Sequence, residues 1–387
     1  MAGAPAARGC VQLHCAKCNT ASITGSGMAY IFAAATLLVA LAPHAFAQCD
    51  TNCSLNGDCV ANACVCDVSW SGSPQCDVLA LLPAAPDSGY RNTSGASWGG
   101  RPLYDPTDKL WHLMAAQMRN NCSLWTWANN SAVIHATSSD PGGPYKYVEE
   151  VLPPFAHNPK LYRVPSWDGG GFLLASIGGG IWNPVARTCT QPYLGGPPSS
   201  QWRHYVEARE APVGAADPTP MNDGCGIVCG PSPLNCGCGI ALAWSATLAG
   251  PWNSTPLIIT DQQRSKYFDC AHSNPTLVWR RDGGGLRMGF NAGYCHGGLE
   301  TVGIAQAPSW RGPWTLASPD PVLWDSPGVP RSCEDPVLWE TSRGWHMIVH
   351  IQDTSQRAAL YAHSFDGVSN WTLHAESGNP GPYVSSI

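Results

Sequence analysis

The sequence predicts an all-β protein in which a small disulfide-rich module precedes a larger domain of repeated sheets. Charged residues make up only 12% of the 387 residues, against about 25% in an ordinary soluble domain. The 41 glycines and 34 prolines favour short strands joined by turns over long helices. Six cysteines gather near the N-terminus, and a strand–turn–strand pattern recurs four times after them.

A hydrophobic stretch from Met28 to Ala47 precedes these cysteines. Its continuous core has about 13 residues, whereas a helix needs about 20 to span a bilayer. The stretch ends with Ala45-Phe46-Ala47, a typical cleavage site. We therefore expect residues 1–47 to be a signal peptide, with Met28 as an alternative start, and the protein to be extracellular. No stable membrane span is expected after cleavage, and an uncleaved signal anchor is the alternative.

Six cysteines lie between residues 48 and 77: Cys49, Cys53, Cys59, Cys64, Cys66 and Cys76. So short a segment cannot enclose a hydrophobic core, so disulfides must supply its stability. The spacing alone leaves fifteen ways of pairing the six cysteines. A module that depends on disulfides requires an oxidising compartment, which agrees with the predicted leader.

The second half of this segment resembles the EGF-like family, in which Cys-x-Cys precedes an aromatic residue, a glycine and a last cysteine. Here these residues are Cys64-Val65-Cys66, Trp70, Gly72 and Cys76. The resemblance implies the pairs Cys49–Cys59, Cys53–Cys64 and Cys66–Cys76, and it implies a surface that could bind a protein partner. Ala47-Gln48 replace the acidic residues of calcium-binding members, so we expect no calcium. A generic disulfide knot is the alternative.

Four Asn-x-Ser/Thr triplets fit the same compartment and are expected to carry N-glycans. They begin at Asn92, Asn129, Asn253 and Asn370. Such triplets also arise by chance, so they only support the prediction of a secreted glycoprotein.

Four repeated segments follow, and each places an aromatic residue nine positions after an alanine. They run from Ala136 to Tyr145, from Ala243 to Trp252, from Ala305 to Trp314 and from Ala362 to Trp371. Each segment follows an apolar run and predicts a strand, a tight turn and another strand. We expect the three closing tryptophans to lie in the core.

A second shared element opens each unit: a polar residue, then proline, then an alternating strand. The openers are Arg101-Pro102, Asn158-Pro159, Asn274-Pro275 and Asp335-Pro336. Alternation with period two is typical of antiparallel strands buried on one face. One unit cannot bury that face alone, whereas radially packed units can, so residues 78–387 are predicted to form a β-propeller. The units cover residues 97–150, 155–255, 270–317 and 333–374.

The second unit contains an insertion, Val185 to Cys238, that is rich in proline, glycine and cysteine. In a cytosolic protein its four closely spaced cysteines would suggest zinc. Behind a signal peptide, disulfides are the expected state of such cysteines. We therefore predict no metal site and no cofactor.

The openers, the alternating strands and the Gly-Pro-Trp endings resemble the five-bladed propellers of the glycoside hydrolase family 43, 32 and 68 group, over residues 97–374. The resemblance implies a central channel lined by the openers. In family 43 it implies inverting hydrolysis by an Asp base, an Asp that tunes a pKa and a Glu acid. The reacting carboxyl groups then lie about 6.5–9.5 Å apart. A fifth blade is also implied; because only four units are visible, we expect a truncated C-terminus, with a four-bladed ring as the alternative.

The acids that this resemblance requires are missing from the first three openers, which carry Arg101, Asn158 and Asn274. Amide and guanidinium groups cannot act as general bases. Only the fourth opener keeps acids, as Glu334-Asp335. The catalytic candidates are Asp335, Glu334 and, as a displaced acid, Glu300; the substrate-binding candidates are Asn158, His157, Asn274 and His272. For the two histidines a hydrogen-bonded structural role is the alternative.

These features predict a secreted carbohydrate-active or carbohydrate-binding propeller protein, with a glycan or polysaccharide as partner. If it is an enzyme, it is a diverged glycoside hydrolase. The alternative is a non-catalytic extracellular adhesion or surface-coat protein that uses the module and the propeller for binding. A net charge of −6 without a basic run argues against a nucleic-acid partner.

Overall fold

The computed structural model describes residues 49, 52–71, 75–80, 83–92, 95–181, 188, 239–264, 272–292, 301–322, 333–351 and 359–374. The predicted signal peptide, Glu300 and almost all of the insertion lie outside these residues. Among the described helices, none has both the length and the apolar character needed to cross a bilayer.

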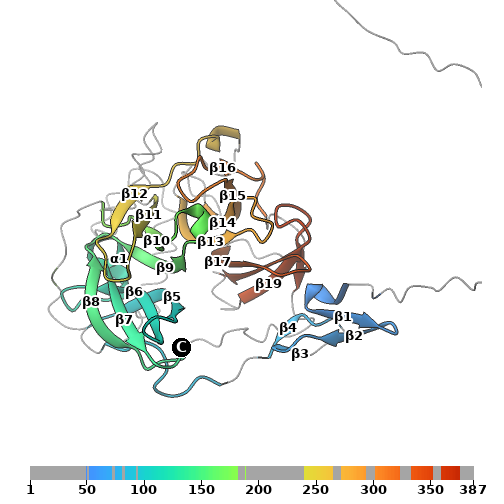
Figure 1. Ribbon diagram of the computed structural model, residues 1–387, viewed down its shortest axis with the longest axis horizontal. Helices are drawn as coiled ribbons and strands as arrows, with labels where there is room; N and C mark the ends of the chain where they lie inside the picture. Colours follow the sequence, from blue (N-terminus) through green and yellow to red (C-terminus); the bar gives the residue numbers. More distant parts are fainter. Residues whose placement is uncertain are drawn as a thin grey trace, which may run out of the picture. The chain divides into compact units, whose positions relative to one another are not determined.

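Four antiparallel sheets of four strands each make up most of the described chain (Figure 1). In every sheet, strands that are consecutive in the chain are neighbours. The first sheet contains β5 (Ser97–Asp105), β6 (Leu110–Met118), β7 (Ser131–Ser138) and β8 (Lys146–Leu152), and the second contains β9 (His157–Arg163), β10 (Phe172–Ile177), β11 (Ile240–Ser245) and β12 (Asn253–Pro256). The third contains β13 (His272–Trp279), β14 (Leu286–Ala292), β15 (Thr301–Ala307) and β16 (Thr315–Leu316), and the fourth contains β17 (Cys333–Glu340), β18 (Trp345–Ile351), β19 (Ala359–Ser364) and β20 (Thr372–His374).

The hydrophobic core lies between successive sheets. Met114 of the first sheet packs in one cluster with Leu161 of the second, and Leu173 of the second packs with Met288 of the third. Residues of the third and fourth sheets form the next cluster. Sheets stacked face to face in chain order are the blades of a β-propeller, and four blades are present in the described part of the chain. The prediction of an all-β propeller is therefore confirmed.

The closing tryptophans of the repeat take part in these clusters. Trp314 is buried in the cluster between the second and third sheets. Trp252 and Trp371 are half-buried and pack against neighbouring clusters. Their role in the blade core agrees with the repeat pattern.

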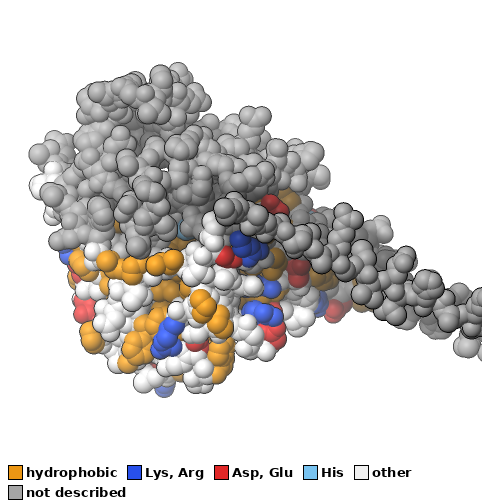
Figure 2. All heavy atoms as spheres, turned by 90° about the horizontal axis from the view of Figure 1, so that it is seen from above, with side chains coloured by type: hydrophobic (Ala, Val, Ile, Leu, Met, Phe, Trp, Pro, Cys, Tyr) orange, Lys and Arg blue, Asp and Glu red, His pale blue; other side chains and the backbone are white. Residues whose placement is uncertain are grey.

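Short helical turns connect some strands: η2 (Leu124–Thr126), α1 (Trp127–Asn130), η3 (Ser166–Asp168) and η5 (Gln262–Arg264). The face in Figure 2 carries hydrophobic side chains with scattered Lys, Arg, Asp and Glu among its described residues. This mixed surface reflects the low charged fraction of the sequence.

The cysteine module (residues 49–80) contains η1 (Asn52–Leu55) and two small hairpins, formed by β1 (Gly57–Val60) with β2 (Ala63–Cys66) and by β3 (Trp70–Ser71) with β4 (Val78–Leu79). Three disulfides join Cys49 to Cys59, Cys53 to Cys64 and Cys66 to Cys76. These are the three pairs that the resemblance implied.

Buried polar contacts join the cysteine module to the fourth blade. Tyr361 in β19 is fully buried. Its hydroxyl accepts a hydrogen bond from Asn56 Nδ2 and donates one to the Ser54 carbonyl, both at 2.8 Å, and its ring lies 4.9 Å from that of Trp70. Arg343 adds an ion pair to Asp67 at 2.5 Å. The module therefore covers part of the fourth sheet.

Candidate functional site

The first strand of each sheet carries an irregularity of register near its start. At this point Asn158, Asn274 and Asp335 adopt positive φ angles of 48°, 48° and 53°. Asn and Asp accept this left-handed conformation better than other residues with a side chain. The opener motif thus has a backbone role, and it places one equivalent side chain on each of these blades.

In the first blade, Gly99 takes this position with a φ of 67°. The prediction that Arg101 opens this blade was wrong by two residues. A Cβ at Gly99 would collide with Oδ1 of Asn158, so the packing favours glycine. Arg101 instead donates a hydrogen bond to the Leu161 carbonyl at 3.3 Å and lies over the Tyr162 ring.

Openers of different blades meet each other. Asn158 Nδ2 donates a hydrogen bond of 2.6 Å to Oδ1 of Asp335, which lies 177 residues away in the chain. Two residues further along β9, Lys160 donates from Nζ to the Pro336 carbonyl at 3.0 Å. The first strands of the second and fourth blades therefore converge on Asp335, which is the centre of the candidate site.

Asp335 is a carboxyl group surrounded by protein on nearly all sides, yet part of its surface stays accessible. Burial, reinforced by the neighbouring Glu334 carboxylate, raises its pKa to about 6, although Lys160, the Asn158 amide and His350 act in the opposite direction. A carboxyl group with such a pKa exchanges a proton near neutral pH.

Glu334 and His350 lie beside Asp335 and are more open to solvent. Glu334 Oε1 is 3.0 Å from His350 Nδ1, and their side chains are 22% and 42% exposed. The ligand atoms of Glu334, Asp335 and His350 all lie within 4.8 Å of one another. This separation is shorter than the distance that inverting hydrolysis requires between its two carboxyl groups. Carboxylate and imidazole are also donor types that divalent cations accept, while the prediction of no metal remains untested.

Lys160 was not among the candidates from the sequence. It is buried, and burial lowers its pKa to about 8, with Arg101 contributing and Asp335 opposing. The sequence does contain one clue to it, because a lysine is unusual in a strand that is expected to be buried, and Lys160 lies only two residues after the opener Asn158. At neutral pH Lys160 therefore carries a positive charge, which acts to lower the pKa of Asp335.

Among the other predicted binding residues, His157 and Asn274 are buried, whereas His272 is half-buried. His157 is buried, its Nδ1 lies 2.9 Å from Ser131 Oγ, and burial lowers its pKa to about 3, so it stays neutral. His272 lies edge-on against Phe290 at 5.1 Å. Asn274 is buried at the opener of the third blade. The hydrogen bond and burial of His157 favour the structural alternative for that residue.

Of the predicted glycosylation sites, Asn253 and Asn370 are exposed and Asn92 is half-buried. The side chain of Asn129 is outside the described part of the structure. Among the three described positions, Asn253 and Asn370 therefore have the more accessible acceptor amides.

No protein-family model matches the chain, and no curated protein matches it. Solved structures that it resembles include an endo-1,4-β-xylanase from Bacteroides thetaiotaomicron, at 13% identity and a TM-score of 0.43 over 74% of this chain and 77% of that one. A thermostable family-43 glycoside hydrolase is 15% identical, with a TM-score of 0.43 and 76% of each chain covered. A family 117 glycoside hydrolase from Zobellia galactanivorans is 12% identical, with a TM-score of 0.43 over 74% and 71%. The similarity is in the fold of the backbone alone.

Proposed function

We propose that the protein is an extracellular carbohydrate-active propeller that binds a saccharide at Asp335, between the first strands of its blades. The observation that carries this proposal is the enclosed Asp335 carboxyl, which Asn158 holds at 2.6 Å and whose pKa is raised to about 6. Carboxylate and amide groups in a partly enclosed position bind sugar hydroxyls by hydrogen bonds.

The same carboxyl group could donate a proton to a glycosidic oxygen, because a general acid must be protonated near the working pH. Below about pH 6 Asp335 carries that proton. Glu334 is a second carboxylate beside Asp335, but it lies closer than the two carboxyl groups of an inverting enzyme. Hydrolysis is therefore tested together with binding.

A specific observation also favours binding without turnover. The positions equivalent to Asp335 are Gly99, Asn158 and Asn274, and none of these three offers a base. In that case the propeller would act as a glycan-binding adhesion or coat protein. The disulfides of the cysteine module support an oxidising location for either role.

The experiment compares glycan-array binding with hydrolysis of a panel of aryl glycosides by the same protein. Asp335→Asn should weaken saccharide binding about tenfold, because an amide replaces a charge-assisted hydrogen bond. Asp320→Asn, at an exposed aspartate, is the matched control. Turnover that disappears in Asp335→Asn establishes an enzyme, whereas binding without turnover establishes the adhesion role. Wild-type protein that neither binds nor hydrolyses any saccharide contradicts the proposal.

A further inference from the structure

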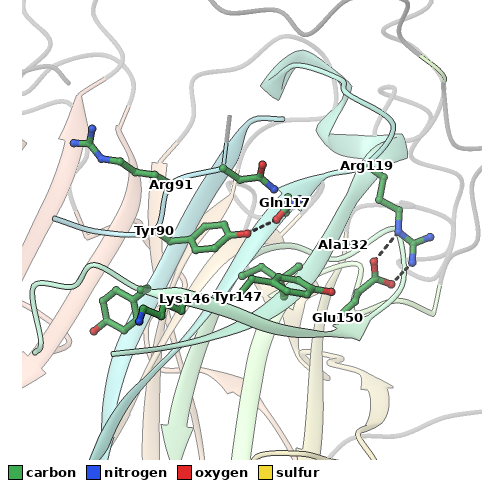
Figure 3. Close-up of a pocket in the computed structure, with 11 residues that line it drawn as sticks. Tyr90, Arg91, Gln117, Arg119, Ala132, Lys146, Tyr147 and Glu150 are labelled. Atoms are coloured by element: carbon green, nitrogen blue, oxygen red, sulfur yellow. Dashed lines mark hydrogen bonds and ion pairs between the residues drawn. The ribbon is translucent and has the colours of Figure 1, made fainter. Parts of the chain in front are cut away.

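A second candidate site is a pocket of about 580 Å³ on the first sheet (Figure 3). Its volume lies within the range of about 300–1,000 Å³ that is typical of small-ligand sites. The lining comes from β6, β7 and β8 and from the segment around Tyr90. It includes none of Asp335, Glu334 or Asn158, so the pocket is independent of the proposed site.

The pocket is positively charged on a protein whose net charge is −6. Arg91, Arg119 and Lys146 line it, against one carboxylate, Glu150. Glu150 pairs with Arg119, whose Nε lies 2.7 Å from Oε2. Arg91 and Lys146 are exposed and have no carboxylate partner within the described residues. Two cationic groups are therefore available to an anionic ligand.

Tyrosine rings lie between these charges. In Figure 3, Tyr90 and Tyr147 occupy the middle of the pocket, with Arg91 at one end and the Arg119–Glu150 pair at the other. The Tyr90 hydroxyl donates to Gln117 Oε1 at 2.7 Å, which orients the ring. Tyr147 is 55% exposed, so its ring surface is open to contact. The apolar face of a sugar ring packs well on such an aromatic plane.

We infer that this pocket binds an acidic saccharide, one that bears carboxylate or sulfate groups. The tyrosines supply the stacking surface, and Arg91 and Lys146 supply the charge. A small inorganic anion would leave the aromatic surface unused. The core of a glycan attached at Asn92, which also lines the pocket, is neutral and would leave the two cations unused.

The test is calorimetric titration of the full chain with three tetrasaccharides: an oligogalacturonate, the same compound with its carboxylates reduced to alcohols, and a sulfated galactose oligomer. We expect one or both acidic compounds to bind at one site, at least tenfold more tightly than the reduced compound. Arg91→Gln and Lys146→Gln should each raise the Kd about threefold, as expected for loss of one exposed ion pair. Tyr147→Ala should weaken binding without changing its dependence on salt.

Two variants serve as controls. Lys109→Gln removes an exposed positive charge from the turn between β5 and β6 and should leave the Kd unchanged. If Lys109→Gln weakens binding as much as Arg91→Gln or Lys146→Gln does, the acidic compounds respond to positive charge in general and occupy no defined site. Binding that appears only after Ser94→Ala removes the Asn92 triplet would assign the pocket to the protein's own glycan. Either result, or no binding of any acidic compound, overturns the inference.

Discussion

Replacing Tyr361 by phenylalanine should loosen the cysteine module from the fourth blade. The hydroxyl of this buried residue takes part in three contacts of 2.8 Å: with Asn56 Nδ2, with the Ser54 carbonyl and with His346 Nδ1. A phenol donates one hydrogen bond and accepts two, so each contact uses a different part of its capacity. Phenylalanine keeps the ring and removes all three.

The expected magnitude follows from the groups left behind. Asn56 Nδ2 keeps its hydrogen bond to the Cys76 carbonyl at 3.0 Å. The Ser54 carbonyl and the His346 ring nitrogen lose their Tyr361 partner in a buried position. At about 1–3 kcal/mol for each buried group that loses its partner, the free energy of unfolding should fall by about 3 kcal/mol.

The assay is urea unfolding followed by circular dichroism, with hydrogen exchange of the module amides between residues 57 and 66. Faster exchange of these amides in Tyr361→Phe would locate the effect at the interface. Tyr104→Phe is the control, because Tyr104 is 42% exposed and should change the free energy by less than about 0.5 kcal/mol. If Tyr361→Phe unfolds like the wild type and its module amides exchange at the same rate, the hydroxyl contributes nothing to docking and the reasoning is refuted.

Three further predictions concern other residues of the propeller. Burial, followed by the charge of neighbouring histidines, lowers the pKa of His346 and His363 to about 4; an unfolded histidine has a pKa near 6.5. The unfolded chain thus binds more protons between these values, so stability is complete above about pH 6.5. It should fall by about 3 kcal/mol for each of the two histidines on acidification to pH 4, measured by urea unfolding across this range. Asp168→Ala should cost about 3 kcal/mol in the same measurement, because Trp279 Nε1 and Ser309 Oγ donate to this buried carboxylate at 2.8 and 2.6 Å; a loss below 1 kcal/mol would contradict this. Gly99→Ala should displace the Asn158 side chain and weaken saccharide binding by at least about threefold, whereas Gly283→Ala, which has open space around it, should leave binding intact.

The blades were predictable because their signals are local. The alternating strands and the turns before Trp252, Trp314 and Trp371 repeat at similar intervals, and each describes a structure within one blade. The opener motif was likewise visible wherever Asn or Asp fills the left-handed position. In the first blade Gly99 has the left-handed conformation, so the Asn-Pro signature is absent there. The sequence pattern therefore placed the opener of this blade at Arg101.

The candidate site was only partly predictable, because its contacts join residues distant in the chain. Asp335 and Glu334 were recognised as the remaining acids of the openers. The pairing of Asp335 with Asn158 across 177 residues depends on how the blades are arranged, which no local pattern encodes. Lys160 and His350 were missed because a single charged or titratable residue in a strand has no periodicity of its own.

The contact between Asn56 and Tyr361 spans 305 residues, which bears on the order in which the protein is made. At a synthesis rate of about 5–20 residues per second, the cysteine module waits about 15–60 seconds for the strand that will cover it. During this time the module must survive on its own. Its disulfides join cysteines only ten or eleven residues apart, so all six cysteines have been synthesised long before β19. The module can therefore complete its folding during synthesis, before the fourth blade packs against it.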